Sequence, residues 1–299
     1  MEHLCLETKD LTKKFGKFTA LDHVNLQLRQ GEVFGYIGPN GAGKTTTIRL
    51  LLGILKPTEG NAKIFGLDPW KDAVEIHKRV AYVPGEMNLW DSLTGGEVID
   101  LFMRLQGKGT PETREKYIRL FELDPSKKCS TYSKGNRQKV ALVAAFAADA
   151  DLLILDEPTT GLDPLMEQVF VSCVEEEKAK GKTILLSSHI LSEVERICDR
   201  VGIIREGKLV ETGTLSELRH LTGTTMTVET RLPVTGIETV AGVSDAVRKG
   251  NVLTFHGDSK ETERILSYLL PFGVTKIQSA PATLEDLFLR HYNKEGGQE

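Results

Sequence analysis

Phosphate chemistry is indicated by a glycine-rich segment, GPNGAGKTT, at residues 38–46. It follows an apolar run at 33–37 and leads into a helix-like segment, which is the context that gives such a motif meaning. Its three glycines let the backbone aim N–H groups at one point, where a polyphosphate can bind at the positive end of a helix. Lys44 can reach the β- and γ-phosphates, and the Thr45 hydroxyl can bind Mg²⁺. The segment predicts a nucleoside polyphosphate site with Mg²⁺; a plain glycine-rich turn is the alternative.

Two other apolar runs end in polar residues. The run at 152–155 ends in Asp156 and Glu157, and the run at 183–187 leads to His189. Adjacent acids at the end of a buried strand are costly unless they meet a metal ion or a proton. A lone histidine is more often structural, but in a parallel sheet ligands gather beyond the carboxyl ends of the strands. We therefore expect these side chains and the glycine-rich segment at one edge of a sheet.

Two more positions have both a functional and a purely structural interpretation. Ser133 and Gly135 precede an apolar helix at 140–148, so they can form a second anion site or simply cap the helix. Phe15 lies in the polar stretch KKFGK, where its ring is either used for binding or packed against the domain edge. The residues alone leave both choices open.

Composition limits the class of protein. At 299 residues the chain is long enough for two domains, and its formal charge of −4 gives no basic excess for nucleic acid. Its four cysteines form no CxxC pair, which fits neither a disulfide framework nor a zinc site. The N-terminus is charged and no apolar run approaches about 18 residues, so we expect the polypeptide to be soluble when alone.

The order of elements predicts an α/β fold. Strands dominate residues 4–28, amphipathic helices occupy about 93–148, and the apolar strands described above lie on either side of that helical insert. A first domain is predicted to cover 1–222. Residues 223–299 start the periodicity again in the order of a split βαβ unit, a small α+β domain with a closing helix at 282–292.

Taken together, the motifs resemble those of the ATP-binding cassette (ABC) transporter ATPases over most of residues 1–222. The order and spacing of the motifs carry this resemblance, since the glycine-rich segment alone would fit many P-loop proteins. In chain order they are GPNGAGKT (Walker A), YSKGNRQ (the signature), LLILDEP (Walker B), Gly161-Leu162-Asp163 (the D-loop) and Ser188-His189 (the switch histidine). The resemblance implies a P-loop NTPase fold with an antiparallel β subdomain and a helical subdomain at about 93–148.

The resemblance also implies a role for each matching residue. Thr45 and Asp156 would hold Mg²⁺; Glu157 would polarise the attacking water, His189 would contact the γ-phosphate, and Lys44 would act with them. Ser133 and Gly135 would cap ATP bound to a second cassette. The residues expected to bind nucleotide are Phe15, Gly38, Asn40, Gly41, Ala42, Gly43, Lys44, Thr45, Thr46, Ser133, Gly135 and Asp163.

The chain departs from the family pattern in two places. Gly85 occupies the position of a glutamine that touches the metal and the transport domain, and Glu86 follows it. Either Glu86 replaces that glutamine or the metal keeps an extra water. In the signature, Lys134 and Asn136 stand where glycine and glutamine are commoner.

The tail, residues 280–290, resembles that of bacterial drug, antibiotic and polysaccharide exporter cassettes. The resemblance therefore implies an ATP-hydrolysing subunit with ATP and Mg²⁺. Its partners would be a second copy or a related ATPase and membrane permease chains, and it would lie at the cytoplasmic face of the membrane. The alternative is a soluble ABC ATPase acting on ribosomes or DNA; a single unsplit cassette without basic excess argues against it. Residues 223–299 would be a dimer brace or a ligand-binding module.

Overall fold

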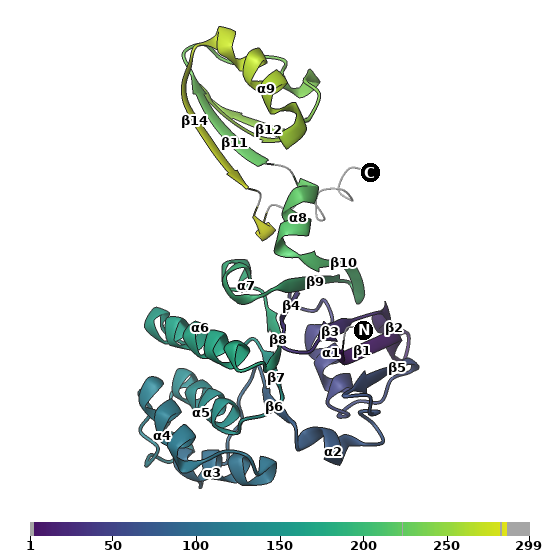
Figure 1. The fold of residues 1–299 in the computed structure, drawn as a ribbon, viewed down its shortest axis with the longest axis vertical. Helices are drawn as coiled ribbons and strands as arrows, with labels where there is room; N and C mark the ends of the chain where they lie inside the picture. Colours follow the sequence, from purple (N-terminus) through teal and green to yellow (C-terminus); the bar gives the residue numbers. More distant parts are fainter. Residues whose placement is uncertain (1–2, 223, 282, 286–299) are drawn as a thin grey trace. The chain divides into compact units, whose positions relative to one another are not determined.

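The structure is a computed structural model that describes residues 3–222, 224–281 and 283–285 (Figure 1). It divides into two compact units, Met1–Thr212 and Gly213–Glu299. Helix α8 (Leu215–Thr222) thus groups with the second unit, whereas the sequence motifs predict a first domain that covers residues 1–222. The closing helix predicted at 282–292 lies largely outside the described residues.

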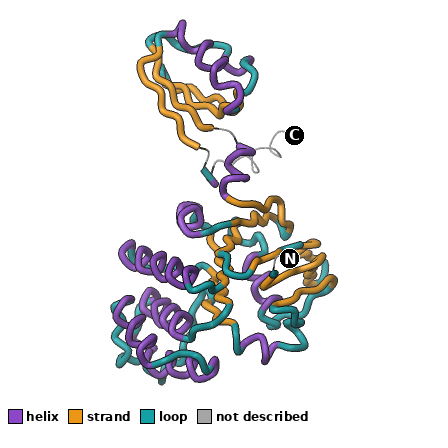
Figure 2. The backbone as a smooth tube through the Cα atoms, viewed as in Figure 1, coloured by secondary structure: helices purple, strands orange, loops and turns teal. Residues whose placement is uncertain are grey.

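A six-stranded sheet forms the centre of the first unit (Figure 2). In spatial order its strands are β10 (Lys208–Thr214), β9 (Arg200–Arg205), β4 (Val33–Ile37), β8 (Thr183–Ser188), β7 (Leu152–Asp156) and β6 (Val80–Val83). The pairs among β9, β4, β8, β7 and β6 are parallel. Every residue of β4, β7 and β8 is buried, which explains their nearly continuous apolar sequences.

The register of these strands sets the position of the polar residues that follow them. Ile37 at the end of β4 pairs with Ser188, and Asp156 at the end of β7 pairs with Ser187. Because the three strands run in parallel, the segments that leave them start at the same edge of the sheet. The glycine-rich segment then leads into helix α1 (Lys44–Leu51).

An antiparallel sheet lies beside the glycine-rich segment. Its strands are β1 (Leu4–Phe15), β2 (Phe18–Val24), β3 (Gln27–Arg29) and β5 (Glu59–Ile64). Leu6, Leu11 and Leu21 of this sheet share one core with Ile48 and Leu51 of α1. The polar sequence from Asp68 to Arg79 predicts a helix. Only α2 (Ala73–His77) is helical there, since the Asp68 side chain accepts the Trp70 N–H at 2.9 Å and holds a turn.

Three helices gather into a helical subdomain, visible as a group in Figure 1. They are α3 (Gly95–Gln106), α4 (Pro111–Leu120) and α5 (Lys134–Ala147). Thr94 and Thr110 each cap a helix through a capping box. Phe146 of α5 stacks on Tyr117 at 5.4 Å between ring centroids, which joins α5 to α4.

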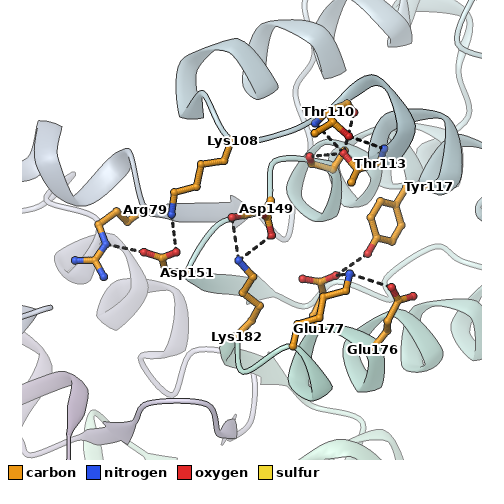
Figure 3. A network of polar contacts seen from close by, with 12 residues as sticks. Arg79, Lys108, Thr110, Thr113, Tyr117, Asp149, Asp151, Glu176, Glu177 and Lys182 are labelled. Atoms are coloured by element: carbon orange, nitrogen blue, oxygen red, sulfur yellow. Dashed lines mark hydrogen bonds and ion pairs between the residues drawn. The ribbon is translucent and has the colours of Figure 1, made fainter.

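Polar side chains tie the helical subdomain to helix α6 (Pro164–Ala179) (Figure 3). The Tyr117 hydroxyl donates to Glu177 Oε1 at 2.6 Å, and Lys180 Nζ lies 2.7 Å from the same oxygen. Only 3% of the Glu177 side chain is exposed. A buried carboxylate needs such partners. The Tyr117 bond joins α4 to α6, whereas Lys180 stands at the end of α6 itself.

The second unit contains a four-stranded antiparallel sheet, β12 (Val243–Lys249), β13 (Val252–Gly257), β11 (Thr224–Thr230) and β14 (Val274–Pro281) in spatial order. Helix α9 (Thr262–Leu269) packs Ile265 and Leu269 against this sheet. This is the strand order of a split βαβ unit, in which the first helix is reduced to the three-residue 3₁₀ turn Ile237–Thr239.

Candidate nucleotide site

Glycine is required by the geometry of the loop between β4 and α1. A Cβ atom on Gly38 would lie 2.3 Å from the Ile204 carbonyl oxygen. Gly43 has φ +115° and a Cβ there would lie 2.6 Å from Leu21 Cδ2. Only glycine satisfies both the close approach and the positive φ, so the loop can present backbone N–H groups without side chains in the way.

Lys44 lies under this loop and is only 5% exposed. Its ammonium group donates to the Gly38 carbonyl at 2.7 Å and to the Pro39 carbonyl at 3.2 Å. The same Nζ lies 3.3 Å from Glu157 Oε1. These three acceptors account for the three donors of the ammonium and hold it beside the loop.

Two oxygen groups meet where a metal ion would be held. The Thr45 hydroxyl donates to Asp156 Oδ2 at 2.9 Å, and the Ser187 hydroxyl donates to the other carboxylate oxygen. Asp156 is 2% exposed. Mg²⁺ prefers oxygen ligands and usually takes one or two from the protein, with the others from water and phosphate. The donor set therefore fits Mg²⁺.

Glu157 has an unusual backbone conformation, with φ +49°. Its N–H donates to the Ser187 carbonyl at 3.0 Å, which helps to hold this left-handed conformation. Its side chain carries Oε2 to within 2.5 Å of His189 Nδ1. Left-handed backbone is costly for a residue with a side chain and concentrates at functional sites. Here it brings the carboxylate between Lys44 and His189.

A pocket of 370 Å³ opens beside these groups. Burial, and next the charge of Asp156, raise the pKa of the Tyr82 hydroxyl to about 12. A Cβ at Gly85 would lie 3.4 Å from the Asp156 carbonyl oxygen, an ordinary contact, so glycine is not sterically required there. The pocket is lined by Thr45, Arg49, Tyr82, Pro84, Gly85, Glu86, Lys134, Asp156, Glu157 and Thr160.

The structure joins some of the predicted site residues and separates others. Lys44, Glu157 and His189 are in contact, as are Thr45 and Asp156. Of the predicted residues, Thr45, Asp156 and Glu157 line the pocket. Phe15 is 48% exposed at the end of β1, Ser133 caps α5 and Asp163 caps α6.

Sequence reasoning missed Arg49 and Tyr82. Arg49 lies one helical turn after Thr45, and that spacing was the available signal. Tyr82 stands in the apolar segment 80–83, whose sequence indicates only a buried strand.

Comparison with known proteins identifies the family. Residues 21–160 match the ABC transporter family. Over 212 residues the chain is 39% identical to the bacitracin transport ATP-binding protein BcrA of Bacillus licheniformis, covering 69% of this chain and 68% of that protein. The chain belongs to the ABC transporter family. It is an ATP-binding cassette, and the predicted family is confirmed.

Two further comparisons agree with this assignment. The chain is 36% identical over 219 residues to YbhF, a probable multidrug ABC transporter ATP-binding protein of Escherichia coli, covering 72% of this chain and 38% of that protein. A solved ATP-binding subunit of an ABC transporter is 35% identical with a TM-score of 0.68, covering 73% of this chain and 92% of that one. The predicted P-loop ABC ATPase fold is confirmed. None of these relatives is named as acting on ribosomes or DNA.

In the part of the chain that the structure describes, no helix combines the length and apolar character needed to span a membrane.

Proposed function

We propose that this ABC ATPase binds Mg²⁺ and ATP at the site described above and couples ATP hydrolysis to export through separate permease chains. The observation that carries the proposal is the Glu157 carboxylate, held between Lys44 at 3.3 Å and His189 at 2.5 Å beside the Thr45–Asp156 pair. The arrangement places the carboxylate of Glu157, the imidazole of His189 and the ammonium of Lys44 around one point. Phosphoryl transfer is catalysed mainly by such positioning and charge stabilisation.

The phosphates would lie over the loop between β4 and α1. The backbone N–H groups of Gly41, Gly43 and the α1 N-terminus would bind the phosphate oxygens, and the Lys44 ammonium would bind them too. Phe15 would stack on adenine, which its 48% exposure permits. The remaining loop positions proposed to contact nucleotide are Gly38, Asn40, Ala42 and Thr46.

Thr45 and Asp156 would hold Mg²⁺, which neutralises charge on the phosphates when bound. Glu157 would accept a hydrogen bond from the attacking water and orient it toward the γ-phosphate. His189 would donate to a γ-phosphate oxygen. Orienting the water needs the carboxylate of Glu157 to be fixed, and the hydrogen bond of its backbone N–H to Ser187 supports that.

A second cassette would complete the site. Ser133 and Gly135 lie at the N-terminus of α5, where Lys134 between them lines this chain's own pocket and they do not. The first N–H groups of a helix favour an anion, so this helix end is suited to cap the γ-phosphate of ATP bound to another copy. Asp163 would face the partner from the start of α6. ATP would then hold two copies, or two related subunits, together.

A large apolar cavity supports a permease partner. It is a half-open hollow of 660 Å³ lined by the 80–90 segment, by helices α3 and α5 and by residues of α2. Trp90 and Leu105, which are 54% and 66% exposed, lie on its wall. Tyr82, Pro84 and Glu86 line both this cavity and the nucleotide pocket. An amphipathic cytoplasmic segment of a permease chain would fit such a surface and sense the bound nucleotide.

The proposed solute class is a drug, antibiotic or polysaccharide. The multidrug and bacitracin names of the relatives support export, and the solute itself would be selected by the permease. The cassette would then act at the cytoplasmic face of the membrane, bound through the permease. The second unit would brace the dimer or bind a regulatory ligand.

The proposal is tested by producing the chain with and without its permease. We expect ATP hydrolysis by the purified chain, recovery in the membrane fraction only with the permease, and a higher ATPase rate in that complex. Stimulation of the ATPase by nucleic acid and not by a permease would contradict the proposal.

A further inference from the structure

Gln138 forms a buried hydrogen bond between α5, the helix that begins in the signature motif, and Pro158, the residue that follows Glu157. It lies on the second turn of α5 and is 3% exposed. Its side-chain Nε2 donates to the Pro158 carbonyl oxygen at 2.9 Å, and this bond is buried. Buried amides that lose such a bond leave polar atoms unsatisfied, so the position of the Pro158 carbonyl depends on α5.

A second contact joins the same two segments. A Cβ atom on Gly135 would lie only 2.4 Å from the Gly161 carbonyl oxygen, so the backbones of α5 and the 157–161 loop touch directly. Gly135 precedes Gln138 by three residues and lies on the same side of the helix. The start of α5 and the 157–161 loop therefore cannot move independently.

The opposite side of the 157–161 loop is fixed to the histidine segment. The Glu157 N–H donates to the Ser187 carbonyl at 3.0 Å. The Thr159 hydroxyl, which is buried, donates to Glu193 Oε2 at 3.0 Å, and Glu193 lies on α7 (Leu191–Ile197) just after His189. Gln138 is thus the polar anchor of this loop on the α5 side.

We infer that Gln138 is a positioning residue that couples the two nucleotide sites of a paired ABC ATPase. This inference rests on the proposed function, in which the start of α5 caps the partner's ATP while Glu157 acts on the chain's own ATP. A displacement of α5 at one nucleotide is then carried through the Gln138–Pro158 bond to the carboxylate at the other. Each copy supplies one such link, so the two sites hydrolyse ATP cooperatively.

The test replaces Gln138 in the full-length chain. Gln138→Met keeps the size of the side chain but removes the amide, and Gln138→Asn keeps the amide but shortens its reach. We expect the Hill coefficient for ATP hydrolysis to fall from near the two-site limit of 2 toward 1, while ATP binding to the isolated chain changes by less than about twofold. Gln138→Asn carries the test if Gln138→Met does not fold.

A matched control separates coupling from loss of stability. Tyr117→Phe also deletes a buried hydrogen bond between the helical subdomain and the rest of the unit, the one to Glu177 at 2.6 Å, but it does not touch the 157–161 loop. We expect this variant to melt at a lower temperature with an unchanged Hill coefficient. An equal loss of cooperativity in both variants would assign the effect to general loosening and would overturn the inference.

Failure of the inference can be told apart from failure of the proposed function. If ATP does not bring two copies together at all, the proposed cap from a second cassette is wrong. If ATP does pair them and Gln138→Met stays as cooperative as the unmodified chain, or if the unmodified pair shows no cooperativity, only the role of Gln138 is wrong.

Discussion

Glu157 Oε2 lies 2.5 Å from His189 Nδ1, while the other oxygen of the same carboxylate lies 3.3 Å from Lys44 Nζ. Glu157 thus joins Lys44, which follows β4, to His189, which follows β8, although more than thirty positions separate it from either along the chain. Its φ of +49° and its N–H bond to Ser187 hold that orientation. The carboxylate is preorganised, which is what a group that orients water requires.

Replacing Glu157 with glutamine is predicted to stop turnover and to leave nucleotide binding intact. The amide has the same shape but loses the negative charge that polarises water, so kcat is expected to fall by about 10²- to 10⁴-fold. ATP should then accumulate in a stable dimer, which size-exclusion chromatography with and without ATP will detect. Normal turnover in Glu157→Gln would refute the role of this residue.

Replacing Lys44 with alanine is predicted to impair binding itself. The ammonium is buried and is the proposed cation at the β- and γ-phosphates. A lost charge-assisted hydrogen bond weakens ATP binding by roughly 10- to 100-fold. Titration with a fluorescent ATP analogue measures this. Lys71→Ala removes an exposed lysine of the same charge and should bind ATP as the unmodified chain does.

The polar residues at the edge of the central sheet were predictable from the sequence, because each of them directly follows an apolar run. Three runs ended in a glycine loop, in Asp156 and near His189, and the strand register places them together. The register brings Asp156 to the same edge as the glycine loop, and the direct contact of Thr45 with Asp156 also depends on how α1 leaves that loop. The left-handed conformation of Glu157 had no sequence signal, because that conformation depends on bonds to Ser187, thirty residues away.

Anchors of the 157–161 loop were also beyond sequence reasoning. Gln138 and Glu193 look like ordinary polar residues on helices, and only the packing of α5 and α7 shows that both bond to the same loop. The length of α2 was mispredicted for a local reason, because the Asp68 side chain competes with the helix for backbone N–H groups.

The Tyr117–Glu177 bond is predicted to stabilise the first unit. Phenylalanine at 117 keeps the ring stack on Phe146 and removes only the hydroxyl that Glu177 accepts. Leaving a buried carboxylate one partner short should lower the free energy of unfolding by about 1–3 kcal/mol. Denaturant unfolding of Tyr117→Phe measures it. An unchanged midpoint would show that Lys180 alone satisfies Glu177.

Glu193 is predicted to give the protein a measurable pH dependence of stability. Burial, reinforced by the negative charge of Glu167, raises the pKa of the Glu193 carboxyl above its ordinary 4.5; Thr159, Ser188 and His189 oppose the shift. The folded state therefore binds this proton more tightly than the unfolded state. Its contribution to stability is favourable below pH 4.5 and is lost as pH rises through the raised pKa.

Glutamine at 193 cannot lose a proton, so Glu193→Gln should melt at a higher temperature than the unmodified chain at pH 7 and at a similar temperature near pH 4. Thermal unfolding of both proteins at the two pH values is the measurement. Glu175→Gln, on an exposed position of α6, is the matched control and should show no such difference. A larger advantage for Glu193→Gln at pH 4 than at pH 7 would reverse the assigned direction.

Glu86 is predicted to matter for communication with a permease more than for hydrolysis itself. It lines both the nucleotide pocket and the 660 Å³ cavity, whereas Gly85 lines only the nucleotide pocket and has no side chain. Glu86→Ala should lower the permease-stimulated ATPase rate about fivefold or more, with a smaller effect on the basal rate.

Gly85→Gln restores the side chain that the family pattern has there. In the Glu86→Ala background it should recover part of the stimulation, because a Cβ atom at 85 would meet only ordinary contacts beside Asp156. Equal loss of the basal and the stimulated rate in Glu86→Ala would instead place Glu86 in the hydrolytic step.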